Sequence, residues 1–133
     1  YFQTLQSPEN FGFVTAYKDT YGQERVTSAP IASAYAAVYL WRELVENAQS
    51  TAIEQVHSAM AQPITYVAPD GPIQIDIDTQ HTYKRARIGI VRADGLIDEV
   101  ISSEEPLPPD PFLSAYPWAK EVQEMVESLN ESP

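Results

Sequence analysis

The spacing of apolar residues changes once along the chain, from a helical period in the first half to alternation after Pro63. An amphipathic helix repeats its apolar positions every three or four residues, whereas a strand buried on one side repeats them every two. We therefore expect helices first and an antiparallel β region second. A last amphipathic helix is predicted from Trp118, Val122, Met125, Val126 and Leu129.

The first predicted helix runs from about Pro8 to Tyr21. Ser7 supplies a capping hydroxyl, and Pro8 suits the first helical position because an N–H has no partner there. Gly22 ends the helix in the way common at helix C-termini. The apolar positions at helical spacing are Phe11, Val14, Tyr17 and Tyr21.

A second helix is predicted from Ala29 to Ala48, and its part from Pro30 to Trp41 is apolar almost all round. Helices of this kind are normally covered on most sides. Thr51 and Glu54 have the spacing of a capping box, which predicts the start of a short third helix. The apolar face of that helix holds Ile53, Val56 and Met60.

Strands are predicted in the β region. Ile73 to Ile77 alternates apolar and polar residues, as a half-buried strand does. A strand from Tyr83 to Ala93 turns at Asp94-Gly95, where glycine accepts positive φ, and Leu96 to Ile101 returns as its hairpin partner. Prolines from Pro106 to Pro111 then form an extended connector that cannot be helical.

Charge and composition exclude two classes of partner. The formal net charge is -11, and the acidic excess lies in the C-terminal third of the chain. Nucleic acids and anionic membrane surfaces need clustered Lys and Arg, so neither is expected to bind. Cysteine is absent, which excludes disulfides and thiolate metal sites and leaves periplasm and cytoplasm both open. No run of about 18 apolar residues could span a membrane.

Candidate catalytic groups are few. His57 and His81 lack the spacing of a zinc site, and no serine lies in a nucleophile motif, so we expect no metal and no cofactor. Asp76 and Asp78 would share one face of a strand, which leaves open a small hydrolase that uses both carboxylates. A solvent-facing row is the alternative.

One basic cluster stands out in the acidic chain. It consists of Lys84, Arg85 and Arg87 on a predicted strand, which would turn Lys84 away from the two arginines. We expect these side chains to balance neighbouring carboxylates.

Short motifs follow one another along the chain: Tyr1-Phe2-Gln3 with Ser7-Pro8-Glu9-Asn10, Tyr35-Ala36-Ala37-Val38 with Leu40-Trp41, Ala68-Pro69-Asp70-Gly71-Pro72, and Pro108-Pro109-Asp110-Pro111-Phe112. In this order they resemble the C-terminal portion of the type I periplasmic binding protein family. The most similar branch holds urea-transport binding proteins and the amide-sensing regulator of aliphatic amidase. The similarity extends to about Pro111.

The resemblance implies an α/β fold in which this chain is the C-terminal part of two lobes that close on a ligand like a hinged jaw. Residues 1–28 would belong to the second lobe, and residues 29–62 would form hinge-crossing helices of the first lobe. Residues 63–105 would return to the second lobe as antiparallel strands. Residues 106–133 would be a Pro-rich connector and a C-terminal helix.

The resemblance also implies a function without a covalent step. The leading hypothesis is the periplasmic solute-binding component of an ABC importer for urea, short-chain amides or related small polar solutes, with a membrane permease as partner. The alternative is an amide-sensing regulatory protein on the same fold. Ligand-binding positions in this chain would be Tyr1, Pro30 and Ile31. Surfaces left uncovered would favour a homodimer or a domain-swapped dimer.

Overall fold

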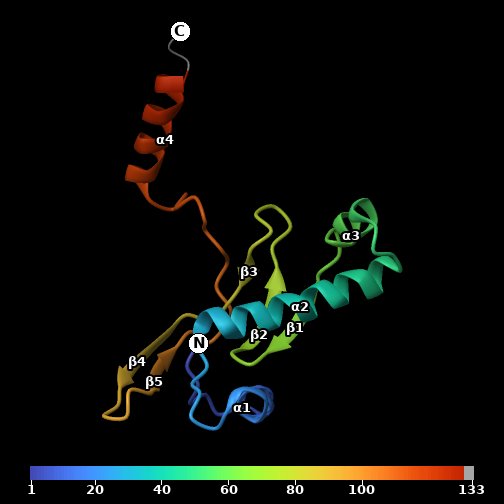
Figure 1. The fold of residues 1–133 in the computed structure, drawn as a ribbon. Coiled ribbons are helices and arrows are strands. Elements are labelled where there is room, and N and C mark those ends of the chain that lie inside the picture. The colour runs from blue at the N-terminus through green and yellow to red at the C-terminus, as the bar shows by residue number, and fades with distance from the viewer. Residues whose placement is uncertain (131–133) are drawn as a thin grey trace.

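The computed structural model describes residues 1–130, with side chains described as far as Ser128. In Figure 1, the helices α1 and α2 and a small sheet form the body, a β-hairpin extends to one side, and the last helix stands away from the body. The helices come first and the strands second, as the change of period predicts. In the described part of the chain, no helix is long and apolar enough to cross a membrane.

Helix α1 (Pro8–Tyr21) begins and ends at the predicted residues. Ser7 caps it, because its Oγ accepts a hydrogen bond of 3.1 Å from the backbone N–H of Asn10. At the other end, Gly22 has a φ of 115° and donates its N–H to the carbonyl of Lys18. A side chain at that φ would be strained, which explains why glycine ends the helix.

The buried face of α1 differs from the predicted apolar row. Asn10 and Phe13 are buried, whereas Phe11 and Tyr21 are exposed. Phe13 is buried because its ring packs against the ring of Tyr35 on α2, with 4.8 Å between the centroids. The helix therefore turns a polar side chain toward the body, which the spacing of apolar residues could not reveal.

Helix α2 (Ala29–Ala48) also has the predicted bounds. One stripe of the helix packs over the sheet (Figure 1), and small residues at its start allow a close approach. The expectation that the helix is covered on most sides is wrong within residues 1–130, because Val38 is 64% exposed and Trp41 is 54% exposed. The buried stripe consists of Ala32, Ala36, Leu40 and Leu44.

Helix α3 (Ile53–Ala59) is present, but the predicted capping box at Thr51 is wrong. Ala52 occupies the N-cap position and has no side chain that could cap the helix. The hydroxyl of Ser50 instead accepts the backbone N–H of Ala52 at 3.1 Å. Of the predicted apolar face, Val56 and Met60 pack against the core and Ile53 is exposed.

The sheet beneath α2 contains β1 (Thr65–Ala68), β2 (Gly71–Ile75) and β3 (Thr82–Tyr83), which are antiparallel and adjacent in that order. The predicted strand from Ile73 to Ile77 is therefore shorter at its end. Beyond Ile75 the backbone turns, and Ile77 is exposed. Ile73 faces the core together with Ile64 and Ala68.

The long strand predicted from Tyr83 to Ala93 is broken in two. After β3, Lys84 leaves the sheet and exchanges backbone hydrogen bonds with Leu107 of the proline connector. The chain then resumes as β4 (Arg87–Val91), which pairs with β5 (Ile97–Ser102) as the predicted hairpin. Gly95, at a φ of 82°, occupies the turn between them.

Gly89 marks a tight point of this hairpin. The register shifts there, between Ile88 and Gly89. A Cβ atom on Gly89 would lie 2.4 Å from Cγ2 of Ile97 and 2.9 Å from the ring of Phe2. Glycine thus permits both the irregular pairing and the packing of the first residues of the chain against the hairpin.

A row of aromatic rings joins α1, α2 and β1. The rings of Tyr1 and Phe13 meet edge to face with centroids 6.0 Å apart. Farther along α2, the rings of Tyr39 and Tyr66 stack at 5.1 Å, and the guanidinium of Arg42 lies over Tyr39. These contacts fix the first helix to the rest of the body.

The proline connector is extended, as predicted, and leads to α4 (Pro117–Asn130). Figure 1 shows α4 projecting from the body. Its described apolar side chains are each half exposed or more: Trp118, Val122, Met125 and Val126. The side chain of Leu129, the fifth member of the predicted face, and residues 131–133 lie outside the described part.

Candidate functional site: a charged cavity beside the hairpin

A cavity of about 550 Å³ lies where four segments of the chain meet. Its walls come from the segment before α1, the turn between β1 and β2, the residues around the start of β4, and β5. Five of the eleven residues that line these walls are charged. They are Asp70, Arg85, Arg87, Asp98 and Glu99.

The turn between β1 and β2 shapes one wall of the cavity. Ala68 and Gly71 are paired across the strands, so Pro69 and Asp70 form a two-residue loop. Gly71 has a φ of 108°, a conformation that side chains rarely adopt. Ser7 holds this turn against the segment before α1, because its hydroxyl donates to the carbonyl of Pro69 at 3.3 Å.

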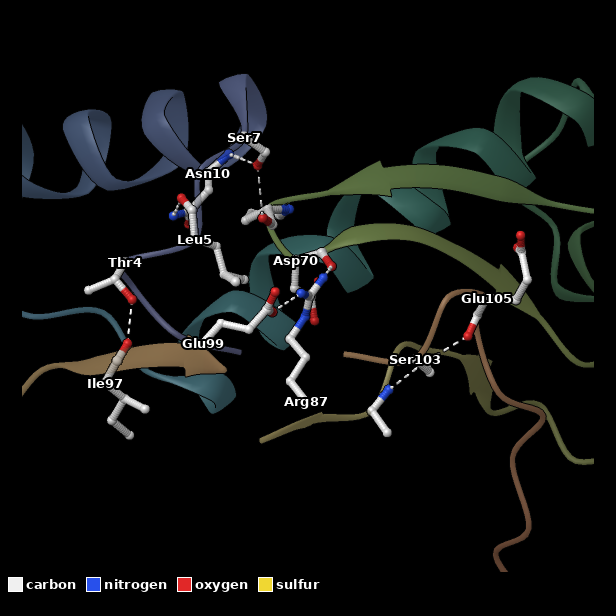
Figure 2. A network of polar contacts seen from close by, with 12 residues as sticks. Thr4, Leu5, Ser7, Asn10, Asp70, Arg87, Ile97, Glu99, Ser103 and Glu105 are labelled. Atoms are coloured by element: carbon white, nitrogen blue, oxygen red, sulfur yellow. Dashed lines mark hydrogen bonds and ion pairs between the residues drawn. The ribbon is translucent and has the colours of Figure 1, made fainter. Parts of the chain in front are cut away.

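Arg87 ties the hairpin to this turn. One end of its guanidinium forms an ion pair with Glu99 on the facing strand. The other end donates a hydrogen bond of 2.7 Å to the backbone carbonyl of Asp70. Figure 2 shows the Arg87 side chain reaching from the hairpin toward both residues. Arg87 therefore has a structural role in forming the cavity.

The other carboxylates of the cavity wall also have cationic partners. The Nζ of Lys84 lies 3.1 Å from the carboxylate of Asp70. The guanidinium of Arg92 is shared between two carboxylates, at 2.8 Å from Asp94 and 3.4 Å from Asp98. The sequence-based expectation that the basic cluster balances neighbouring carboxylates is thus confirmed for Lys84 and Arg87.

Arg85 departs from that expectation. It lines the cavity but forms no ion pair with any residue from 1 to 130. Its Nε atom is buried and has no hydrogen-bond acceptor among the described residues. The basic cluster in the sequence was a signal for this site, but the acidic residues that complete it come from distant positions.

Tyr1, a predicted ligand position, belongs to a buried polar network next to this cavity. Its hydroxyl donates to Oδ1 of Asn10 at 2.8 Å and lies 2.8 Å from the hydroxyl of Thr27. Burial raises the pKa of the Tyr1 hydroxyl, and the hydrogen bond with Thr27 opposes that shift. The side chain of Tyr1 thus already has polar partners within the chain.

Pro30 and Ile31, the other predicted positions, lie in the first turn of α2. Pro30 is exposed and Ile31 is partly buried. Thr27 lies three residues before Pro30. Its contact with the hydroxyl of Tyr1 therefore places the predicted positions Tyr1, Pro30 and Ile31 in the same region of the fold. The cavity described above is lined by neither Tyr1, Pro30 nor Ile31.

The paired carboxylates considered for a hydrolase do not share a strand. β2 ends at Ile75, and Asp76 instead closes a turn. Its carboxylate accepts the backbone N–H of Thr79 at 2.9 Å and the hydroxyl of Thr79 at 2.8 Å. These bonds lower the pKa of Asp76. The geometric basis of the hydrolase hypothesis, with Asp76 and Asp78 on one strand face, is therefore wrong.

Comparisons with solved structures show where this fold occurs. The chain is similar to a solute-binding protein of an ABC transporter from Rhodopseudomonas palustris BisB5 in complex with 3,4-dihydroxybenzoic acid, with a TM-score of 0.68 and 22% identity over 82% of this chain and 30% of that chain. It is also similar to a solute-binding protein of an ABC transporter from R. palustris HaA2 in complex with p-hydroxybenzoic acid. The TM-score is 0.67 and the sequence identity 23%, over 87% of this chain and 32% of that chain. At these identities the likeness shows the fold.

Sequence comparison adds a curated relative and a family. A protein of Geobacillus stearothermophilus called limonene hydroxylase is 34% identical over 114 residues, which are 86% of this chain and 21% of that protein. The chain thus spans about a fifth of the relative and about a third of the solved structures. Residues 1–117 match the periplasmic binding protein domain. None of the relatives named above is a urea- or amide-binding protein, so the predicted branch stays a prediction. The resemblance to the family itself is confirmed: the chain belongs to the type I periplasmic binding protein family.

Proposed function

We propose that the protein is the solute-binding component of an ABC importer, working in the periplasm with a membrane permease. The observation that carries this proposal is the match of residues 1–117 to the periplasmic binding protein domain. Solved proteins with the same fold are solute-binding proteins of ABC transporters, which supports the proposal. The hydroxylase name of the curated relative belongs to a protein of which this chain matches 21%, so we do not extend that activity to this chain.

The lobe arrangement follows from the same proposal. Residues 1–28 and 63–105 belong to the second lobe, residues 29–62 cross to the first lobe, and residues 106–133 follow as connector and helix. The exposed apolar side chains of Val38 and Trp41 support this arrangement, because a helix of this composition is normally covered on its second side by other parts of a fold.

The solute class is a small polar molecule such as urea or a short-chain amide. Tyr1, Pro30 and Ile31 line the solute cleft in this proposal. The solved proteins of the same fold carry hydroxybenzoic acids, so aromatic acids are the competing class. An amide-sensing regulator on the same fold is the alternative function and acts through a protein partner instead of a permease.

Thermal-shift measurements on the full-length gene product test the proposal. The panel holds urea, acetamide, a branched-chain amino acid, a nucleoside and 4-hydroxybenzoate. A ligand that binds only the native state raises the melting temperature. At a concentration a hundredfold above its Kd, it increases the free energy of unfolding by about 2.7 kcal/mol. A rise with urea or acetamide supports the amide class, and a rise with 4-hydroxybenzoate alone contradicts it.

Two further results separate the importer from the regulator. Recovery of the protein in the periplasmic fraction, together with solute uptake that is lost on deletion of its gene, supports the importer. A cytoplasmic protein whose deletion leaves uptake unchanged contradicts it. If no solute in the panel raises the melting temperature, the proposed binding function loses its support.

A further inference from the structure

We propose that α4 and the loop before it form a docking surface for another protein, whose groove is apolar along its floor and carries Lys or Arg along one side. The family match ends at residue 117, where α4 begins, so the helix lies outside the domain on which the proposed transport function rests. The proposal is carried by the apolar face of α4, by the loop that precedes it, and by the negative charge beside both.

The apolar side chains of α4 lie on one face and are open to solvent. Trp118, Val122 and Met125 follow one another at intervals of three or four residues, which is the spacing of one helix face. Each is half exposed or more, and Figure 1 shows the helix standing away from the body. An isolated helix of 14 residues is marginally stable in water, and helices in proteins gain stability by burying such a face. A partner is therefore expected to cover it.

The loop before α4 adds aromatic rings to this face and holds them in place. The carboxylate of Asp110 accepts the backbone N–H of Ser114 at 2.7 Å and its hydroxyl at 2.8 Å. These bonds close the loop that carries Phe112, whose side chain is exposed. The rings of Tyr116 and Trp118 follow, with centroids 6.2 Å apart. Exposed aromatic residues on a fixed backbone are typical of protein interfaces, where they supply many of the strongest contacts.

The negative charge around this face selects the partner. From residue 104 to residue 128 the chain has six carboxylates and one lysine. None of these seven side chains forms an ion pair with any residue whose side chain the structure describes. An acidic surface repels a second copy of itself, nucleic acid and anionic lipid, and it attracts Lys and Arg. Charge complementarity therefore favours a different protein with a basic rim.

The carboxylates lie along one border of the apolar face. Glu121 comes three residues after Trp118 and four before Met125, so it lies beside both on the helix surface. Glu124 continues this row, whereas the opposite border carries the uncharged Gln123. A groove with Lys or Arg along one side thus fixes the direction in which α4 lies, because only one orientation brings the two charged borders together.

The first experiment identifies the occupant. A photocrosslinking amino acid takes the place of Val122 in the full-length gene product, and the same amino acid at Glu127, on the opposite face of α4, is the control. Both proteins are irradiated in native cell extract. We expect a crosslink to a different protein from position 122 and none from position 127. Capture counts as support only together with binding measurements on the purified pair.

Calorimetry on the purified pair tests each part of the surface. Trp118→Ala should weaken binding about tenfold or more, as loss of an aromatic anchor does. The double change Glu121→Gln/Glu124→Gln should weaken binding about threefold to tenfold at low salt, and less at high salt, where charges are screened. Glu104→Gln/Glu105→Gln removes the same charge ahead of the proline connector. It is the control and should change binding less than about twofold.

A further measurement separates the other occupants. In protein labelled with 5-fluorotryptophan, the fluorine resonance of Trp118, assigned as the signal missing from Trp118→Phe, should shift when the captured protein is added. It should stay in place with vesicles of phosphatidylglycerol and phosphatidylethanolamine, and as the protein itself is concentrated.

Four results would overturn the proposal, and none of them bears on solute binding in the thermal-shift panel. A shift of the Trp118 resonance with vesicles assigns the face to a membrane, and a shift with concentration assigns it to a second copy. Crosslinks from position 122 that stay within the chain, or that do not exceed the control at position 127, leave no protein partner. Binding of the captured protein that is unaffected by salt and by Glu121→Gln/Glu124→Gln contradicts the basic rim.

Discussion

The hydroxyl of Tyr1 donates a hydrogen bond of 2.8 Å to the side-chain carbonyl of Asn10, a residue that is only 2% exposed. The amide nitrogen of Asn10 in turn donates to the backbone carbonyls of Gln3 at 2.9 Å and Leu5 at 2.8 Å. One buried side chain thus ties the segment before α1 to the first turn of that helix.

Asn10→Asp should therefore lower the free energy of unfolding by about 2 kcal/mol or more, because two buried carbonyls lose their donor and face a carboxylate oxygen. Asn47→Asp is the control, since Asn47 is an exposed residue of α2 with one side-chain hydrogen bond. Its cost should stay below about 1 kcal/mol. Guanidinium denaturation measures both variants, and equal costs would contradict the role of Asn10.

Gly89→Ala should lower the free energy of unfolding by about 1–3 kcal/mol, because its Cβ would overlap Ile97 and the ring of Phe2. Gly12 is a matched glycine on α1, where a Cβ would meet nothing within 4 Å. Gly12→Ala should raise the free energy of unfolding by about 0.5–1 kcal/mol, the difference in helix propensity. The same sign for both variants in thermal denaturation would rule out this account of Gly89.

Leu40→Ala should lower the free energy of unfolding by about 2–5 kcal/mol, since Leu40 belongs to the buried stripe of α2 and its removal leaves a cavity. The matched change on α4 is Val122→Ala, at a side chain that is 50% exposed. Its effect should lie within about 0.5 kcal/mol of zero. Denaturation curves in which Val122→Ala costs as much as Leu40→Ala would show that α4 packs on the body.

The pKa of Asp76 should lie below its ordinary value of 3.8, because its carboxylate accepts two hydrogen bonds from Thr79. The stability that Asp76 contributes is present above the unfolded-state pKa and is lost as pH falls through the lower folded-state pKa. Thr79→Ala should raise the pKa of Asp76 in an NMR titration. Asp110, whose pKa is lowered by its own bonds to Ser114 and Ala115, should be unaffected and serves as the internal control.

The 133-residue chain alone should form a homodimer or a domain-swapped dimer at high concentration. Its hairpin exposes apolar side chains that an isolated monomer would leave in water, including Ile88, Ile90 and Ile101 at 61–65% exposure. Light scattering after size exclusion measures the mass, and Ile90→Lys should shift the chain toward monomer. A wild-type chain that stays monomeric at millimolar concentration would contradict the prediction.

Local signals in the sequence predicted the helices and the hairpin well. Ser7, Pro8 and Gly22 act within one turn of α1, so both of its ends followed from neighbouring residues. The bounds of α2 and the glycine turn at Asp94-Gly95 are local in the same way. Family membership also followed from the sequence, through the order of short motifs between Tyr1 and Phe112.

The buried face of α1, the break after Tyr83 and the charged cavity were decided by tertiary structure. Phe13 faces inward because α2 brings Tyr35 against it, and the strand ends near Lys84 because Leu107 pairs there. The charged cavity likewise depends on residues that lie far apart along the chain, from Thr4 to Glu99. The period of apolar residues shows which face of a helix or strand is apolar. It does not show which elements pack together, because contacts between residues far apart in the chain leave no periodic pattern in the sequence.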